Sequence, residues 1–154
     1  DPDILAWMFS GEPDERFIRD LFELRGLIEP AASALAARRR NPAQVAAMEK
    51  ALAEMHRHGL ATAEGREADQ RFHGLILAAA GNEPLTSLSS SVSAAVTWTT
   101  RFKQRKLGLA RDPHAEHLAV FQAIAAGDPE GARTAMEELL RLALRDMDLP
   151  PRGA

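Results

Sequence analysis

Apolar residues recur at intervals of three and four along most of this chain, which is the spacing of one buried helix face. No segment alternates Val, Ile and Thr with polar residues as a half-buried strand does. Helices are predicted over residues 3–10, 14–39, 42–58, 61–80, 84–106, 113–126 and 129–147. The connections are short, so neighbouring helices should run antiparallel. The pattern predicts an all-α protein, an antiparallel bundle of six to seven helices.

The ends of these helices carry residues with strong capping preferences. Three pairs combine a capping oxygen with a proline in the first helical turn, namely Asn41-Pro42, Asp112-Pro113 and Asp128-Pro129. Glycines suited to ending a helix stand at Gly59, Gly81 and Gly127.

Three ionisable side chains interrupt the apolar faces of two predicted helices. Asp69 and His73 are one turn apart on the face that carries Phe72, and His117 shares a face with Val120. Burying such groups costs several kcal/mol unless a polar partner compensates. One carboxylate oxygen and two imidazole nitrogens are ligands that zinc, nickel and manganese accept. These residues therefore form a candidate divalent metal site.

A structural explanation of the same residues is also open. A core histidine is often satisfied by a backbone carbonyl or a water molecule. Asp69 and His73 can also form a hydrogen-bonded pair one turn apart that binds nothing else.

Arg25 interrupts the apolar face formed by Ile18 and Phe22 in the helix predicted over 14–39. Its guanidinium cannot lose its charge, so a buried Arg25 needs a partner. Glu29, one turn further on, is the structural candidate. The functional alternative is the carboxylate of a ligand, which the planar guanidinium binds through two hydrogen bonds. A metal nearby would attract the same small organic anion.

The helix predicted over 84–106 is rich in Ser and Thr, which are poor helix formers. Leu85, Val92 and Val96 still supply an apolar face. Small hydroxyl residues either let helices approach closely or hydrogen-bond a polyhydroxylated ligand, and the pattern leaves both roles open.

Composition narrows the class of protein. The chain has 154 residues, 45% of them hydrophobic, which suffices for one domain with a sizeable core. It has no cysteine, which excludes disulfides and thiolate metal sites and fits a cytoplasmic protein. No apolar run approaches the roughly 18 residues of a membrane span, and no signal peptide is present. A formal charge of −3 argues against binding a phosphate backbone by itself.

Four spaced motifs, in order, resemble a known family. They are Glu23-Leu24-Arg25-Gly26-Leu27-Ile28-Glu29-Pro30, Asp69-Gln70-Arg71-Phe72-His73, Ala80-Gly81-Asn82, and Glu116-His117 followed by Ala123-Ile124 and Gly127-Asp128. Together they cover nearly the whole chain and resemble the C-terminal effector-binding (FCD) domain of the FadR subfamily of GntR-type bacterial transcription regulators. The opening Asp1-Pro2-Asp3 with Leu5-Ala6-Trp7 is similar to the branch that contains galactonate-responsive repressors.

The resemblance implies a helical bundle whose core binds a divalent metal and a small carboxylate effector. Three of the four metal ligands of the family match Asp69, His73 and His117. The fourth, a histidine on the last helix, falls at Leu139, which cannot ligate. Three protein ligands still leave a position that a water or an effector oxygen can complete. Alternatively, His73 and His117 contact the effector directly in a metal-free pocket.

The same resemblance adds Arg25 as the contact for the effector carboxylate. Polarity and placement alone suggest Asn82, Trp98 and Arg101 as further residues of the pocket wall. The effector class that we expect is an aldonic or related sugar acid.

GntR-type regulators carry a winged helix-turn-helix before this domain, and the sequence shows no such alternation of short helices and strands. We therefore expect residues 1–154 to be a single effector-binding and dimerisation domain. It should form a homodimer and reach DNA only through an N-terminal domain absent from this chain.

Two other classes of protein fit parts of the same pattern. A metal-dependent helical hydrolase or lyase would need a general base that the sequence does not offer, so we expect no enzyme. A purely structural dimerisation bundle would show no stabilisation by any ligand.

Overall fold

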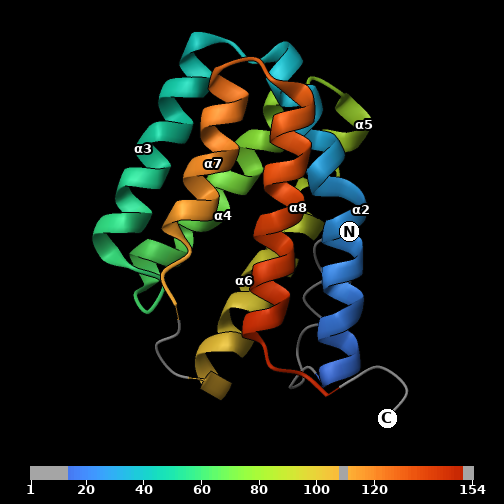
Figure 1. The fold of residues 1–154 in the computed structure, drawn as a ribbon, viewed down its shortest axis with the longest axis vertical. Helices are drawn as coiled ribbons and strands as arrows, with labels where there is room; N and C mark the ends of the chain where they lie inside the picture. The colour runs from blue at the N-terminus through green and yellow to red at the C-terminus, as the bar shows by residue number, and fades with distance from the viewer. Residues whose placement is uncertain (1–13, 108–110, 151–154) are drawn as a thin grey trace.

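Helices joined by short turns make up the part of the chain that the structure describes. The computed structural model describes residues 14–107 and 111–150, with the backbone alone for residues 103–107. Within these ranges it has no strand, and the predicted all-α class is confirmed. The helices are α2 (Glu15–Arg39), α3 (Pro42–His58), α4 (Ala63–Ala79), α5 (Glu83–Thr86), α6 (Ser89–Leu107), α7 (His114–Ala125) and α8 (Pro129–Asp146) (Figure 1). The helix predicted over residues 3–10 lies outside the described residues.

Most of the predicted capping residues stand at or next to a helix end. Asn41 and Gln44 form a reciprocal capping box at the start of α3, and the side chain of Asp128 caps α8. Asp112 differs, because α7 begins one residue later than a cap at this position requires. Its carboxylate accepts from the backbone N–H of His114 at 3.0 Å, while Pro113 holds the N-cap position.

The segment predicted as one helix over 84–106 is two helices, and this boundary prediction is wrong. The side chain of Asn82 caps α5, which ends after Thr86, and α6 begins at Ser89. The hydroxyl of Ser87 donates to the carbonyl of Pro84 at 2.6 Å, a local bond that competes with the helical ladder. The hydroxyl-rich composition therefore breaks the helix near its start.

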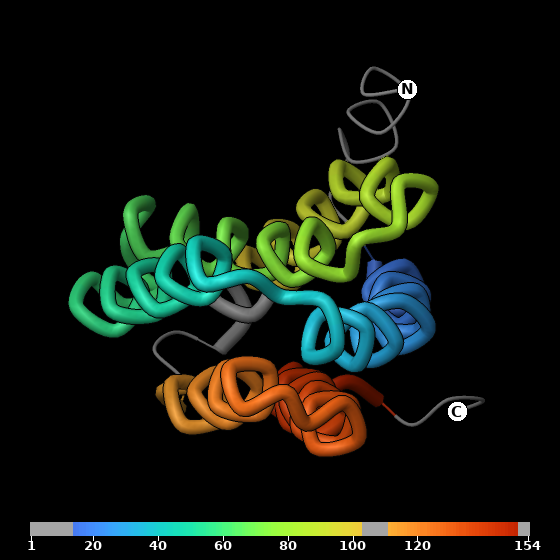
Figure 2. The backbone as a smooth tube through the Cα atoms, turned by 90° about the horizontal axis from the view of Figure 1, so that it is seen from above, coloured from blue at the N-terminus to red at the C-terminus, as the bar shows by residue number. Residues whose placement is uncertain are grey.

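Two helix pairs and one long helix form the bundle. Helices α3 and α4 pack against each other, as do α7 and α8. Seen from above, these two pairs lie on opposite sides of the molecule (Figure 2). Helix α2 packs against α8, α4, α6 and α7, so it joins the two sides, and α6 packs against α2 and α4.

The buried apolar residues form two clusters. The larger one includes Phe72, Ile76, Val120 and Leu139 and holds α3, α4, α7 and α8 together. The smaller one joins α2, α6 and the end of α8 through Ile18, Leu21, Phe22, Ala95 and Met147. Each fully buried Val, Leu, Ile, Phe or Met side chain contributes about 1.5–3 kcal/mol to folding, so these clusters fix the relative positions of the helices.

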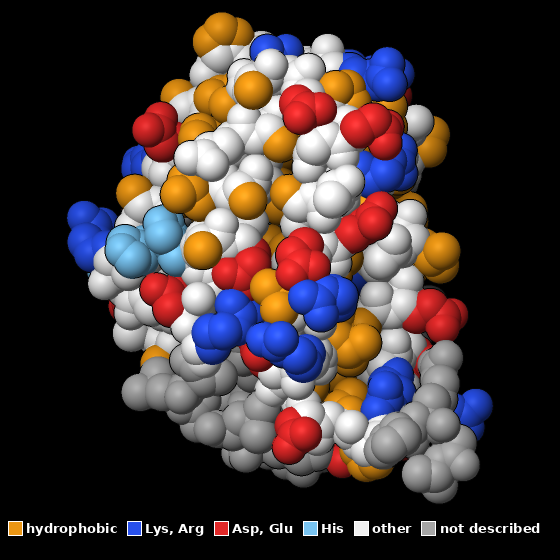
Figure 3. Space-filling model, viewed as in Figure 1, with side chains coloured by type: hydrophobic (Ala, Val, Ile, Leu, Met, Phe, Trp, Pro, Cys, Tyr) orange, Lys and Arg blue, Asp and Glu red, His pale blue; other side chains and the backbone are white. Residues whose placement is uncertain are grey.

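Charged side chains of both signs are interspersed on the face formed by α7 and α8 (Figure 3). Arg141 is ion-paired with Glu138, and Arg111 is ion-paired with Asp146 and Glu116. On this face the basic side chains are thus largely matched by acidic ones, unlike those of a phosphate-binding surface. None of the described helices has the length and hydropathy needed to span a bilayer.

Candidate metal and effector site

The four ionisable residues singled out by helical spacing are buried together. Arg25 on α2, Asp69 and His73 on α4, and His117 on α7 are each at most 4% exposed. They lie between the two apolar clusters, because the cavity beside them is lined by Phe22 and Met147 of one cluster and by Leu139 of the other. The predicted inward orientation of these side chains is therefore confirmed.

Three acceptor atoms converge at the centre of this group. Asp69 Oδ1 lies 3.1 Å from His117 Nε2 and 3.3 Å from His73 Nε2. The two Nε2 atoms are 3.4 Å apart. Asp69, His73 and His117 thus form a triangle of possible ligand atoms contributed by two helices.

The tautomers of both histidines follow from their outer contacts. His73 Nδ1 contacts a carboxylate oxygen of Glu29, and His117 Nδ1 lies 2.8 Å from the carbonyl oxygen of Pro113. Since both partners only accept, each Nδ1 must carry a proton. In the neutral imidazoles both Nε2 atoms then direct lone pairs at one another and at Asp69. Such an arrangement needs a cation, either an additional proton or a metal ion.

The spacing of the triangle fits a borderline divalent metal. Ligand bonds of about 2.0–2.1 Å place the donors of a tetrahedral site roughly 3.3–3.4 Å apart, close to the three separations found here. Each histidine also has the hydrogen-bonded Nδ1 that metal-binding histidines usually show. Asp69, His73 and His117 therefore fit a divalent metal such as zinc, nickel or manganese.

The electrostatics of the site also favour positive charge. Burial lowers the pKa of the His73 imidazole, but the negative charges and hydrogen bonds of Glu29 and Asp69 outweigh burial and raise it to about 9. Burial raises the pKa of Glu29, but the positive charges and hydrogen bonds of Arg25 and His73 outweigh burial. They lower the pKa of Glu29 to about 2. Burial also raises the pKa of Asp69, but its close contacts with His117 and His73 outweigh burial and hold that pKa well below its usual range. Without a metal, the site retains a proton on His73 at neutral pH.

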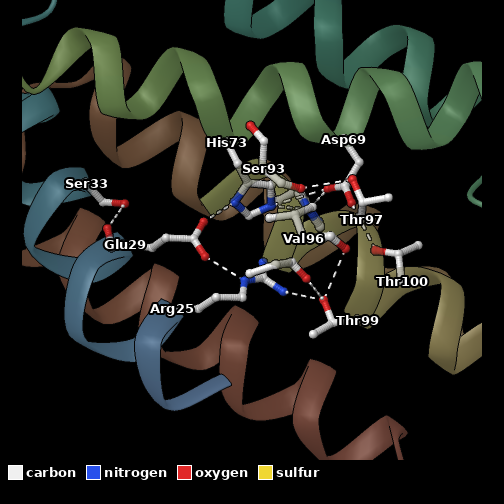
Figure 4. A network of polar contacts seen from close by, with 12 residues as sticks. Arg25, Glu29, Ser33, Asp69, His73, Ser93, Val96, Thr97, Thr99 and Thr100 are labelled. Atoms are coloured by element: carbon white, nitrogen blue, oxygen red, sulfur yellow. Dashed lines mark hydrogen bonds and ion pairs between the residues drawn. The ribbon is translucent and has the colours of Figure 1, made fainter. Parts of the chain in front are cut away.

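Arg25 has the structural partner that the sequence offered as one alternative. Its Nε donates to Glu29 Oε2 at 2.7 Å, and its Nη1 donates to Thr99 Oγ1 at 3.1 Å (Figure 4). The guanidinium carbon also lies 5.5 Å from the centre of the Phe22 ring. Arg25 is therefore neutralised within the protein, and a ligand carboxylate would have to share it with Glu29.

Two threonines of α6 complete the polar network and were not singled out by sequence. Thr99 accepts from Arg25 and donates to the carbonyl of Ala95 at 2.8 Å. The hydroxyl oxygen of Thr100 lies 3.5 Å from Asp69 Oδ2. The signal available in the sequence was the hydroxyl-rich stretch itself, which did not distinguish these two residues from their neighbours.

A cavity of about 40 Å³ adjoins the network. Its lining includes the four ionisable residues, both threonines and Leu139. A cavity of this size holds a few water molecules at most. An organic acid of several carbons requires the surrounding helices to move apart.

The remaining predicted pocket residues lie outside this cavity. The side chain of Asn82 accepts from the backbone N–H of Leu85 and caps α5. Trp98 packs against the smaller apolar cluster, and Arg101 is exposed. Polarity and placement alone did not separate a capping, packing or surface side chain from one that faces the cavity.

Known proteins of similar sequence are transcription regulators. A family model described as the FCD domain matches residues 20–142. The galactonate operon transcriptional repressor of Escherichia coli strain K12 is 33% identical over 138 residues, which cover 88% of this chain and 59% of that protein. The HTH-type transcriptional regulator LutR of Bacillus subtilis strain 168 is 32% identical over 125 residues, 77% of this chain and 57% of that protein. The chain thus spans less than two thirds of either relative, and both are regulators, not enzymes.

Solved structures share the fold at lower identity. Streptococcus agalactiae GntR has a TM-score of 0.71 at 24% identity, over 85% of this chain and 59% of that one. The E. coli protein McbR/YncC has a TM-score of 0.74 at 16% identity, over 88% of this chain and 66% of that one. The metal-free FCD domain of the transcriptional regulator TM0439 has a TM-score of 0.64 at 23% identity, over 89% of this chain and 95% of that one.

The matched residues 20–142 run from the second turn of α2 to α8 and contain every residue of the polar network. The chain belongs to the FCD domain family of GntR-type transcription regulators.

Proposed function

We propose that this FCD domain is the ligand-sensing part of a bacterial transcription regulator, in which a divalent metal and a small organic acid bind side by side. Asp69, His73 and His117 hold the metal, and Arg25 contacts the carboxylate of the acid. A bound metal would supply positive charge and an open position for a carboxylate or hydroxyl oxygen.

One observation carries this proposal: three acceptor atoms meet at 3.1–3.4 Å while both outer imidazole nitrogens are already used. Glu29 and the carbonyl of Pro113 hold the two rings in this orientation. Groups arranged in this way repel one another unless a cation lies among them.

The network around the cavity favours a hydroxylated acid. Arg25 offers a planar donor for a carboxylate, and Thr99 and Thr100 offer hydroxyl groups close to it. One relative is named as the repressor of a galactonate operon. We therefore propose a sugar acid or another small hydroxy acid as the effector.

The small size of the cavity suggests how binding would be transmitted. An acid of several carbons would have to displace α6, which brings Thr99 and Thr100 to the cavity and packs against α2 and α4. We propose that the bound acid selects a second arrangement of α6 against α2, and that this shift alters how an N-terminal domain of the full regulator binds DNA. The domain would act as a homodimer.

A thermal-shift screen tests the proposal. Sugar acids and small hydroxy acids are added to the protein with and without a chelator, and with zinc, nickel or manganese restored. A ligand at a hundred times its dissociation constant stabilises the fold by about 2.7 kcal/mol, which corresponds to a rise in Tm of roughly 5–10 °C for a domain of this size.

The variant Arg25→Ala separates a specific carboxylate site from a general salt effect. If its fold is retained in the metal-loaded state, it should lose the acid-dependent shift and keep the metal-dependent one. A protein that no metal and no acid stabilises would instead be a purely structural bundle, and the proposal would be withdrawn.

A further inference from the structure

Glu29 occupies a position that joins the two halves of the proposed site. It is 2% exposed and lies on α2 one turn after Arg25. Its Oε2 accepts from Arg25 Nε at 2.7 Å, and its Oε1 accepts from His73 Nδ1 (Figure 4). One carboxylate therefore contacts both the proposed anion-binding residue and a proposed metal ligand, without itself facing the triangle of ligand atoms.

The contact with His73 determines which nitrogen of the ring is available. Because Oε1 accepts from Nδ1, the proton is fixed on that nitrogen and the lone pair of Nε2 points at Asp69 and His117. Carboxylates that hold a histidine in this way raise the affinity of the ring for a metal. Glu29 is thus placed to orient His73.

The contact with Arg25 has a different consequence. A buried guanidinium that already has a carboxylate at 2.7 Å offers an incoming anion little unbalanced charge. A second carboxylate would lie close to Glu29 and be repelled by it. A divalent metal nearby supplies the additional positive charge that permits both carboxylates to remain.

We propose that Glu29 is a positioning residue that makes anion binding dependent on the metal: it orients His73 for the metal, and it neutralises Arg25 so that an anion binds only when the metal adds positive charge. This inference rests on the proposed function. It predicts that a change at Glu29 weakens metal binding and, in the absence of metal, strengthens anion binding.

The first experiment measures Ni²⁺ affinity by isothermal titration calorimetry. In Glu29→Gln the single amide oxygen can accept from Arg25 or from His73, but not from both. We expect Ni²⁺ affinity to fall about 10- to 100-fold. The control is Ser33→Ala, one turn further along α2. It removes a buried hydroxyl that donates to the backbone carbonyl of Glu29 at 2.8 Å, and it should leave the affinity within about twofold.

The second experiment measures glycolate binding, with and without saturating Ni²⁺. In the wild-type protein Ni²⁺ should raise glycolate affinity strongly. In Glu29→Gln the metal-free protein should bind glycolate at least tenfold more tightly than the metal-free wild type. The ratio of glycolate affinity with Ni²⁺ to glycolate affinity without Ni²⁺ should therefore fall. Ser33→Ala should keep the wild-type ratio.

Two further measurements cover the case in which Glu29→Gln does not fold. Glu29→Asp keeps the charge, but its side chain is one methylene shorter and cannot reach both partners. It should lose Ni²⁺ affinity and still not bind glycolate without metal. In the wild-type protein, imidazole ¹⁵N spectra should show His73 protonated at Nδ1 and bound to a diamagnetic metal, Zn²⁺, through Nε2.

The inference and the proposed function fail in different ways. A wild-type protein that binds neither Ni²⁺ nor glycolate overturns both. Only the role of Glu29 is overturned if the wild-type protein binds both and a folded Glu29→Gln variant behaves like it. Such a variant would have the wild-type Ni²⁺ affinity and the wild-type ratio of glycolate affinities with and without Ni²⁺. Binding of Zn²⁺ through His73 Nδ1 would also overturn it.

Discussion

The ion pair between Arg25 and Glu29 allows a quantitative prediction that needs no metal. Their charged atoms are 2.7 Å apart and the side chains are 5% and 2% exposed. In Arg25→Met, Glu29 stays buried, and among the described residues His73 is its only remaining charged contact. Breaking a buried pair by removing one partner costs about 3–5 kcal/mol, and the contact with His73 places the expected loss near the lower limit, about 3 kcal/mol.

Urea denaturation with a chelator present measures this loss at neutral pH. Glu29→Gln should destabilise the protein comparably, because it leaves the guanidinium unpaired. The double variant should be more stable than either single variant, since both charges are gone and no buried charge is left alone. The coupling free energy from this cycle should be about 2 kcal/mol or more.

A matched control lies on the surface of α8. Arg141 and Glu138 are also 2.7 Å apart, but their side chains are 60% and 48% exposed. The corresponding Arg141→Met variant should unfold close to the wild-type urea concentration, because water screens this pair. If Arg25→Met behaved like Arg141→Met, the buried pair would not contribute as described and the argument for a neutralised Arg25 would fail.

Three further predictions concern the cavity and its charges. Leu139→His supplies a nitrogen at the fourth ligand position and should raise Zn²⁺ affinity at least tenfold in equilibrium dialysis; an unchanged affinity would mean that residue 139 cannot reach the ion. The pKa of His73 is raised from 6.5 to about 9 in the folded protein, so its contribution to stability is complete below pH 6.5 and is lost as the pH rises through about 9. The unfolding free energy of metal-free protein should therefore fall across that interval, and His73→Gln should remove the slope. Thr99→Val takes away the acceptor of Arg25 Nη1 and should weaken glycolate binding to the Ni²⁺-loaded protein severalfold in calorimetry, whereas a full-strength response would exclude a role for this hydroxyl.

Helical spacing was sufficient to find four of the buried polar residues. Arg25, Asp69, His73 and His117 stand on faces that are otherwise apolar, so their burial follows from local sequence alone. The starts of α3 and α8 were equally predictable, because Asn41 and Asp128 cap through contacts only a few residues away.

What the sequence did not reveal depends on contacts between distant segments. Glu29 and His73 are 44 positions apart, and Thr99 reaches Arg25 across 74 positions. The sequence offered Glu29 as a partner for Arg25 at a helical spacing, but its second contact arises only when α2 packs against α4. Likewise, nothing in the residue types distinguished Thr99 and Thr100 from the other hydroxyl residues of α6.

The backbone carbonyl of Pro113 that holds His117 connects the cluster to the beginning of α7. Pro113 itself makes no side-chain cap there, so the cluster and the carboxylate of Asp112 help to anchor the first turn. Occupation of the triangle would therefore suppress local opening at this helix end. Amide hydrogen exchange in the first turn of α7 should slow on metal loading, which would make it a backbone reporter of whether the site is occupied.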